Sequence, residues 1–398
     1  MALIPLLAAT LLLPDAPPGG GTYHLAPDGS DAGDGSPARP WRTLAHAAAR
    51  IPDDGSTVLL HDGVYEGLQT IARHFRVPAT FRAAHPYRAV LRNPSGHRVL
   101  RIYDASNVVL DGLVLEGTPA RGEYLVHIGT AGAHHRTVQN CILHDSHDND
   151  LVKVNDRACF VTFRGNLFHN QNRKGGDEHL DLNTVTDITV EDNLFFNDFA
   201  GSGRAFGIKG ARNVVFRANT VSGDLPCGGG CFAFRISREG ANPVNDRIRF
   251  PNNLWSDPTG TMTDFADGPP EDATNVVLRR NLYWNGGKPL PRDRAVLNVP
   301  DDPEALTADP GLPDPKGLVL PRWDPKTGRF PSGSSTIRQE FERLALGYGA
   351  PPAGSPAIDA ADPAEAPPDD LLGRPRPSGP RPDLGACEAR PAFTRRRN

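Results

Sequence analysis

A short apolar pattern recurs along the middle of this chain at nearly equal intervals. Each copy has a β-branched run, a marker residue that is usually Asn, and a second short apolar stretch, as in "DITVEDNLFFN". The steps between successive markers are 28, 26, 27, 26, 34 and 28 residues. Strand-built repeats of this length predict the stacked coils of a parallel β-helix, with the Asn side chains hydrogen-bonded from coil to coil. The markers are Gly112, Asn140, Asn166, Asn193, Asn219, Asn253 and Asn281, and we expect Asn140, Asn166, Asn193 and Asn219 to stack at one turn.

A second family of strands follows the same interval and predicts which side chains face outward. Its members are "YLVHIG", "DLVKVN", "HLDLN", "AFGIKG" and "FAFRIS". Successive side chains of a strand point to opposite faces, so the apolar positions should enter the core and the residues between them should face solvent. The inward set is Ile128, Val154, Leu182, Ile208 and Ile236. One outward level is His127, Lys153, Asp181, Gly207 and Arg235, and the next is Gly129, Asn155, Asn183, Lys209 and Ser237.

The sequence predicts three segments. They are a signal peptide at 1–21, an all-β parallel β-helix at 22–297, and a Pro-rich extension at 298–398. The apolar run 2–13 has the length of a signal peptide and is too short to span a bilayer, so we expect a secreted protein without a membrane span. "WRTLAHAAARI" predicts a short helix that covers the first coil, because a solenoid exposes its core at each end. The extension should pack on the β-helix or trail from it as an irregular tail, with one helix in "TIRQEFERLALG".

Charge and cysteine content narrow the partners that we expect. The net charge of −4 gives no basic surface, so nucleic acid is not an expected partner. Cys141 takes an apolar position in its repeat and is interpreted as a core residue. Cys227 and Cys231 would either close a small loop in an oxidising compartment or remain two thiols. We expect a monomer.

The stretch "GGDEHLDLN" gathers three acidic groups, Asp177, Glu178 and Asp181, in one coil. Adjacent coils lie about 4.8 Å apart, so Asp150 or Asp148 of the preceding coil should lie beside them. Carboxylates crowded in this way repel one another unless a cation binds among them, and oxygen ligands suit Ca²⁺ before Mg²⁺. The alternatives are a solvated acidic turn without function, or a zinc site, for which no thiolate or HExxH-type spacing is present; its ligands would be His144, His147 and His179.

Lysine is rare in this chain, yet two lysines fall beside the acidic motif. Only six of the 43 basic residues are Lys, and Lys153 and Lys209 flank Asp181 on the predicted outer face. A Lys close to other cations can lose its proton and act as a base, whereas Arg stays charged. The alternative is an ordinary surface ladder of Asp and Lys.

"DEHLD" and "AFGIKG" resemble motifs of the family-nine pectate lyases, which are right-handed parallel β-helices. The resemblance covers roughly residues 100 to 240. It implies that Asp177, Glu178 and Asp181 bind Ca²⁺ and that Lys209 removes the substrate proton. Lys153 with Arg235 is similar to the Lys/Arg pair of chondroitinase- and alginate-type β-helix lyases, so either lysine could be the base.

The resemblance implies β-elimination on an acidic polysaccharide that contains uronate. Lys209 or Lys153 would take the proton from C5, while Arg235 and His179 would hold the sugar carboxylate or hydroxyls. The groove would also present His127, Asn155 and Asn183 to the substrate.

Two other functions remain open from the sequence. A β-helix glycoside hydrolase could use Asp150 and Asp181 as its carboxyl pair, without a metal. A non-catalytic carbohydrate-binding surface protein would use the same groove without a base. GxSxG, Walker A and Rossmann motifs are absent from the sequence, so esterase, NTPase and dehydrogenase functions have no support.

Overall fold

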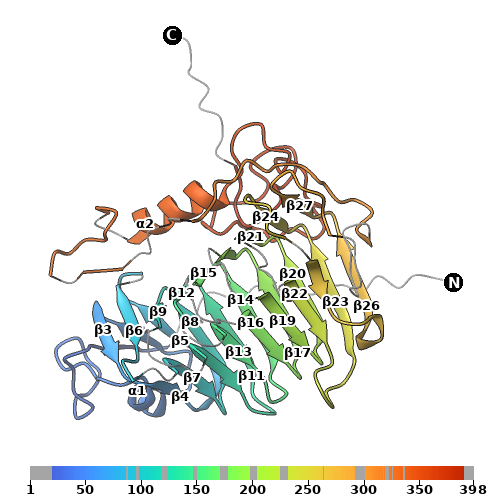
Figure 1. The fold of residues 1–398 in the computed structure, drawn as a ribbon. Helices are drawn as coiled ribbons and strands as arrows, with labels where there is room; N and C mark the ends of the chain where they lie inside the picture. Colours follow the sequence, from blue (N-terminus) through green and yellow to red (C-terminus); the bar gives the residue numbers. More distant parts are fainter. Residues whose placement is uncertain are drawn as a thin grey trace, which may run out of the picture.

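The protein is an all-β right-handed parallel β-helix built from three parallel sheets (Figure 1). This confirms the fold class that the repeats predicted. The computed structural model describes residues 20–86, 88–95, 98–117, 124–146, 150–170, 178–197, 204–224, 232–262, 264–291, 301–316, 318, 322–324, 326–334 and 337–389.

Each sheet takes one strand from nearly every coil. The ten-stranded sheet contains β1 (Thr22–Leu25), β2 (Thr57–Leu60), β5 (His74–Ala83), β8 (Ser106–Asp111), β11 (His134–Gln139), β14 (Cys159–Arg164), β17 (Thr186–Glu191), β20 (Arg212–Arg217), β23 (Asn245–Pro251) and β26 (Ala273–Arg279). The eight-stranded sheet contains β4 (Gln69–Ile71), β7 (Leu100–Tyr103), β10 (Val126–Gly129), β13 (Val152–Val154), β16 (Glu178–Asn183), β19 (Arg204–Lys209), β22 (Phe232–Ser237) and β25 (Asp264–Asp267). The nine-stranded sheet contains β3 (Gly63–Glu66), β6 (Ala89–Arg92), β9 (Val114–Glu116), β12 (Ile142–His144), β15 (Leu167–Asn170), β18 (Leu194–Asn197), β21 (Thr220–Gly223), β24 (Leu254–Asp257) and β27 (Leu282–Asn285).

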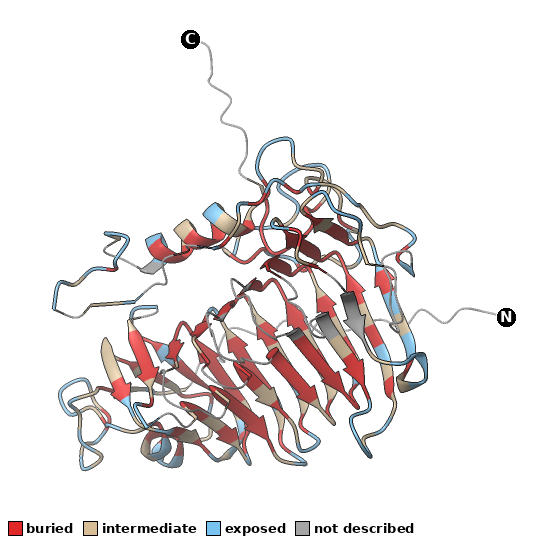
Figure 2. Cartoon of the chain, viewed as in Figure 1, coloured by how far each residue is buried: buried red, intermediate tan, exposed pale blue. Residues whose placement is uncertain are grey.

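The interior of the coil is filled by alternate side chains of all three sheets. Figure 2 shows buried residues running through every level of the solenoid. Aromatic rings contact one another inside the coil: Phe168 and Phe195 stack with centroids 4.5 Å apart, and Phe206 meets Phe195 edge-on at 4.7 Å. Cys141 is also buried in this core, as its position in the repeat predicted, and burial raises the pKa of its thiol to about 12. Burial of this continuous apolar column is the main force that holds the coils together.

One corner of the coil carries a ladder of buried asparagines. The backbone N–H and side-chain amide of Asn166 both donate to Asn193 Oδ1, at 2.9 and 3.0 Å, and the same pattern joins Asn193 to Asn219. It continues in the next two coils and ends where Asn281 donates to Asp302. Buried polar groups lose their hydrogen bonds to water. Each Asn side chain replaces them by accepting hydrogen bonds from the Asn of the preceding coil.

Asn140 does not belong to this ladder, so the expectation for that residue was wrong. Val138 pairs with Phe163 in the strands before the corner, which places Cys141, and not Asn140, opposite Asn166. The backbone N–H of Cys141 donates to Asn166 Oδ1 at 2.9 Å, whereas Asn140 has a φ of 52° and donates from its side chain to Asp111. Asn140 therefore occupies the left-handed position just before the ladder, which Asn tolerates better than most residues.

The first coil is covered by a short helix, α1 (Leu44–Arg50), within the stretch 41–51 where the sequence predicted one. Thr43 caps its N-terminus by accepting a hydrogen bond from His46 N–H, so the helix begins three residues later than expected. Leu44, Ala47 and Ala48 are buried against the core.

The C-terminal extension packs along the outer face of the nine-stranded sheet (Figure 1). Helix α2 (Ile337–Leu344) continues into a short π-helix at Ala345–Gly349, and Phe341 and Leu344 join a cluster with side chains of β12, β15 and β18. A 3-10 turn lies at Pro270–Asp272, just before β26. Within the described part of the chain, every helix is too short or too polar to cross a bilayer.

Candidate active site

The outward residues of the eight-stranded sheet form the rows that the sequence predicted. His127 pairs with Lys153, Lys153 with Asp181, Asp181 with Gly207, and Gly207 with Arg235, each on the next coil. In the following row Asn183 pairs with Lys209. A register of this kind brings together side chains that lie 26 to 28 residues apart in the sequence.

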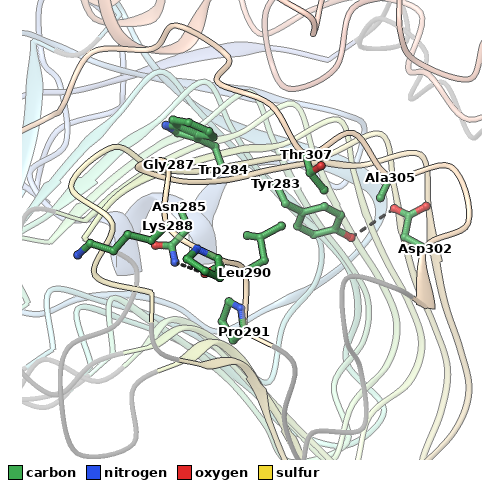
Figure 3. Close-up of a pocket in the computed structure, with 11 residues that line it drawn as sticks. Tyr283, Trp284, Asn285, Gly287, Lys288, Leu290, Pro291, Asp302, Ala305 and Thr307 are labelled. Atoms are coloured by element: carbon green, nitrogen blue, oxygen red, sulfur yellow. Dashed lines mark hydrogen bonds between the residues drawn. The ribbon is translucent and has the colours of Figure 1, made fainter.

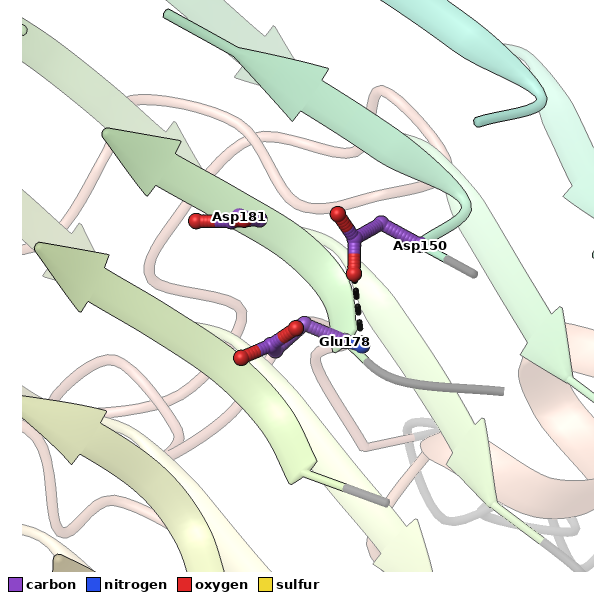
Figure 4. Close-up of side chains that lie close together, drawn as sticks. All are labelled: Asp150, Glu178 and Asp181. Carbon is purple, nitrogen blue, oxygen red and sulfur yellow. Dashed lines mark hydrogen bonds between the residues drawn. The ribbon is translucent and has the colours of Figure 1, made fainter. Parts of the chain in front are cut away.

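Three buried carboxylates meet on this face. One oxygen each from Asp150, Glu178 and Asp181 lies within 4.8 Å of the others, and all three residues are at most 1 % exposed (Figure 4). Asp150 precedes β13, Glu178 begins β16, and Asp150 Oδ1 accepts a hydrogen bond of 3.1 Å from the backbone N–H of Glu178. The two remaining acidic candidates, Asp177 and Asp148, lie outside the described residues. We call Asp150, Glu178 and Asp181 the acidic triad.

Both candidate lysines reach the acidic triad. Lys209 Nζ lies 3.1 Å from Asp181 Oδ2 and 3.3 Å from Glu178 Oε1, and Lys153 Nζ contacts the same Asp181 oxygen. Two ammonium groups therefore face three carboxylates. The other oxygen, Asp181 Oδ1, is buried without a hydrogen-bond donor among the described residues.

Gly207 makes room for this network. A Cβ at that position would lie 2.6 Å from Glu178 Oε1 and 3.1 Å from Lys209 Cε. Any other residue between Asp181 and Arg235 would push the Glu178 carboxylate or the lysine stem aside. The glycine at this outward position therefore has a steric function that the repeat alone does not explain.

The triad has the donor set of a hard-cation site. Its ligands are oxygens only, it carries one more negative charge than its two lysines neutralise, and Asp181 Oδ1 has no donor among the described residues. A buried charge excess is costly unless a counter-charge lies beside it. These residues therefore fit Ca²⁺ better than a softer metal, which would seek nitrogen or sulfur ligands.

The two lysines differ in their surroundings. Burial lowers the pKa of Lys153, and the positive charge of Lys209 adds to this effect, while the carboxylates of Asp150, Glu178 and Glu239 oppose it. The Lys153 side chain is 11 % exposed and that of Lys209 is 5 % exposed. Lys153 is thus the more accessible of the two amines.

Glu239 is a neighbour of the site that the sequence analysis missed. Its Oε2 lies 3.5 Å from Lys209 Nζ, and its side chain is 47 % exposed at the edge of the cluster. It follows β22 by two residues, so extending the outward alternation past Ser237 by one more step would have identified it.

Asn155 and Asn183 line a polar hollow of about 350 Å³ at the ends of β7, β10, β13 and β16. The other lining residues are Tyr103, Thr130, Ala131, Asp156, Arg157 and Thr184. His127 lies beside the hollow and contacts Asn155 Oδ1 through Nε2 at 2.9 Å. Burial lowers the pKa of His127, so its ring is neutral at neutral pH. The hollow adjoins the rows that carry Lys153 and Lys209.

His179 does not lie with the other candidate binding residues. It is 2 % exposed, and its ring lies 6.4 Å from Phe168 and 5.7 Å from Phe195 between ring centroids. Burial lowers its pKa to about 3. We correct the expected contact of His179 with sugar, because at the start of β16 the corner of the coil directs this ring into the core. Arg235 stays on the outer face and is partly buried.

A second hollow, of about 770 Å³, lies elsewhere, beside the last strand of the nine-stranded sheet (Figure 3). Trp284, Lys288 and Leu290 line it, and Tyr283 there donates a hydrogen bond of 3.3 Å to Asp302. It belongs to the C-terminal end of the coil and contains no residue of the acidic triad.

Comparisons with known proteins give partial likenesses. No family model matches the chain. A stretch of 121 residues is 29 % identical to the uncharacterized protein YwoF of Bacillus subtilis (strain 168), covering 28 % of this chain and 25 % of that protein. The chain thus matches about a quarter of the length of that relative.

Several solved structures are similar to this chain over part or most of its length. They include a GH136 lacto-N-biosidase from Eubacterium ramulus, with a TM-score of 0.46 and 13 % identity over 66 % of this chain and 60 % of that one. Pectate lyase Pel9A gives a TM-score of 0.40 and 17 % identity over 93 % of this chain and 96 % of that one. An alginate lyase from Paenibacillus sp. str. FPU-7 gives 0.33 and 16 % identity over 58 % and 94 %. A pectate lyase is therefore among the similar structures, as the sequence resemblance predicted, while the low scores leave the activity of this chain to its own residues.

Proposed function

We propose that this protein is a secreted, Ca²⁺-dependent polysaccharide lyase that cleaves a uronate-containing polysaccharide by β-elimination. The observation that supports this proposal most directly is the contact of two lysines with a buried acidic triad on the outer face of one sheet. Asp181 Oδ1, a carboxylate oxygen of this group, is buried without a hydrogen-bond donor among the described residues, and a bound cation would give it a partner.

Asp150, Glu178 and Asp181 would hold the cation. Bound Ca²⁺ would neutralise the uronate carboxylate and acidify the proton on the carbon next to it. Asp150 is fixed for this task by the backbone N–H of Glu178, and Glu178 by the space above Gly207.

The base is Lys209 or Lys153, and the proton moves from C5 of the sugar to the lysine Nζ. The electron pair left at C5 forms a double bond to C4, the bond from C4 to the glycosidic oxygen breaks, and that oxygen takes up a proton. Lys209 lies one coil beyond Asp181, as the strand alignment predicted. Lys153 has the lowered pKa and the greater exposure, which are properties of a working base.

The remaining expected residues would position the sugar chain. Arg235, on the same row as Asp181, would bind a second carboxylate. Asn155 and Asn183 line the polar hollow next to the lysines and would contact sugar hydroxyls, with His127 orienting Asn155.

The test is the formation of unsaturated product from a panel of uronate polymers, followed by ultraviolet absorbance with and without a chelator. We expect activity that a chelator abolishes and Ca²⁺ restores. Lys209→Arg keeps the charge but removes the titrating amine, so we expect at least a hundredfold loss of kcat if Lys209 is the base. Lys153→Arg is the matched variant on the preceding coil, and the larger loss identifies the base.

Lys326→Arg in the C-terminal extension is the control, since Lys326 is exposed there, and it should keep full activity. Full activity in both Lys209→Arg and Lys153→Arg would refute a lysine base. New reducing ends without absorbance would instead indicate the hydrolase that uses Asp150 and Asp181. Their oxygens approach within 4.8 Å, which is shorter than the spacing of inverting hydrolases. Retention on the polymer without any product would indicate a binding protein.

A further inference from the structure

A column of left-handed residues runs along the corner where the chain enters the ten-stranded sheet. Its members occupy equivalent positions in successive coils, as the pairing of the flanking residues shows. They are Asn107, His135, Phe160, Asp187, Asn213, Arg247 and Asn275, and their φ angles lie between 51° and 58°. Asn and Asp tolerate this conformation, which explains four of the seven.

Phe160 is the member of this column that sequence preference explains least. A bulky aromatic residue is disfavoured in the left-handed region, yet Phe160 has a φ of 51°. It does not compensate by burial, because its exposed fraction is 47 %. Among the described residues three large apolar side chains are exposed, and Phe160 is the only aromatic one. Backbone strain at an exposed side chain points to a function outside the core.

Phe160 lies parallel to His135 of the preceding coil and extends its flat surface. The ring centroids are 4.8 Å apart and the planes differ by 7°. Burial, together with the charges of His134 and Arg136, lowers the pKa of His135, so this ring is uncharged at neutral pH. His134 meets the His135 ring edge-on, with ring centroids 4.9 Å apart, and both Phe160 and His135 remain exposed.

Polar groups suited to sugar hydroxyls lie in the adjoining turns. Asp156 and Arg157, four and three residues before Phe160, line the polar hollow described above, and Thr130 and Ala131, which also line it, lie shortly before His135. A flat apolar ring that follows such hydrogen-bonding groups by a few residues in the chain matches a pyranose, which has an apolar C–H face and a polar rim.

We propose that Phe160 and His135 form a stacking platform for a pyranose ring of a polysaccharide, at a surface separate from the acidic triad. The platform would hold the polymer without taking part in its cleavage. The structural alternative is that the two rings only stabilise neighbouring coils. A binding role and a stabilising role predict opposite effects of Phe160→Asn, since Asn is the common residue in the column. If the rings bind sugar, the variant should lose affinity for the polymer and keep its melting temperature; if they only stabilise the coils, the reverse should hold.

The test is affinity electrophoresis of the full chain in gels that contain polygalacturonate, alginate or a neutral β-glucan. We expect at least one polymer to retard the wild-type protein and Phe160→Asn to weaken that retardation roughly tenfold. The melting temperature of Phe160→Asn should equal or exceed that of wild type, because Asn tolerates the left-handed conformation better. His135→Asn tests the platform from the neighbouring coil and should weaken binding as well.

Val277→Asn is the matched control, since Val277 is 46 % exposed on β26 of the same sheet, and it should be retarded like wild type. Lys326→Arg, in the C-terminal extension, should also be retarded like wild type, since Lys326 is exposed there. Absence of retardation by all three polymers would overturn the proposal. Wild-type retardation of Phe160→Asn with a lowered melting temperature would overturn it too and assign the rings to stability.

Discussion

Two buried polar columns of this β-helix use the same coil spacing in different ways. In the asparagine ladder every coil contributes the same neutral group, and each amide satisfies the one before it. The second column is an outward row of the eight-stranded sheet, in which each coil contributes a different residue. Its members are His127, Lys153, Asp181, Gly207 and Arg235.

The difference separates a structural column from a candidate site. A repeated neutral side chain can be satisfied entirely by its own neighbours, so the ladder needs no ligand. The acidic triad and its two lysines cannot balance their charges by themselves, and Asp181 Oδ1 lacks a donor among the described residues. The candidate site therefore lies where the outward residues change from coil to coil, and the structural ladder lies where one residue type repeats.

The largest expected effect comes from breaking the ladder. Asn193→Ala removes the acceptor of Asn166 and the donor to Phe163 O, so it should lower the free energy of unfolding by about 4 kcal/mol. Urea unfolding measures this change. Asn140→Gly is the matched control outside the ladder, and it should alter stability by less than about 1 kcal/mol, since Gly accepts the left-handed conformation. Equal losses in the two variants would contradict the assignment of the ladder.

The acidic triad should respond to a cation, whereas the ladder should not. Ca²⁺ at a hundred times its Kd should stabilise the folded protein by about 2.7 kcal/mol, seen as a rise in melting temperature. Asp181→Asn should abolish that rise because it removes a central ligand. Asp104→Asn, at a side chain that is 67 % exposed, should retain it. An unchanged rise in Asp181→Asn would show that Ca²⁺ binds elsewhere.

A smaller effect, on the pH dependence of stability, should come from His179 on the inner face of β16. Burial lowers the pKa of His179 to about 3, so the unfolded chain binds a proton that the folded chain excludes between about pH 6.5 and 3. Stability should therefore fall as the pH falls through that range. His179 should account for about 2 kcal/mol of the loss between pH 7 and pH 5.

His179→Leu should remove this part of the pH dependence, which urea unfolding at both pH values measures. His169, whose pKa burial also lowers to about 3, should keep its own share in the variant. If wild type and His179→Leu lost the same stability between the two pH values, the ring would be exposed to solvent and our correction for His179 would fail.

The coil interval and the strand alternation could be predicted from the sequence with few errors. The inward set from Ile128 to Ile236, the outward row from His127 to Arg235, and Asn183, Lys209 and Ser237 of the next row pair in the structure as expected. Side chains alternate between the two faces of a strand, and the coil length is nearly constant. Only one register between neighbouring coils therefore buries the apolar residues, which is why the sequence could predict it. The clustering of Asp150 with Glu178 and Asp181 followed from that register.

The corners of the coil were decided only by the tertiary structure. Alternation ends where the chain turns, so it could not show that His179 points inward or that Asn140 precedes the ladder by one position. The sequence also placed both lysines beside Asp181 without showing that they contact the same oxygen. Side-chain lengths and turn geometry set that contact across adjacent coils, and these depend on the packing of residues that are distant in the chain.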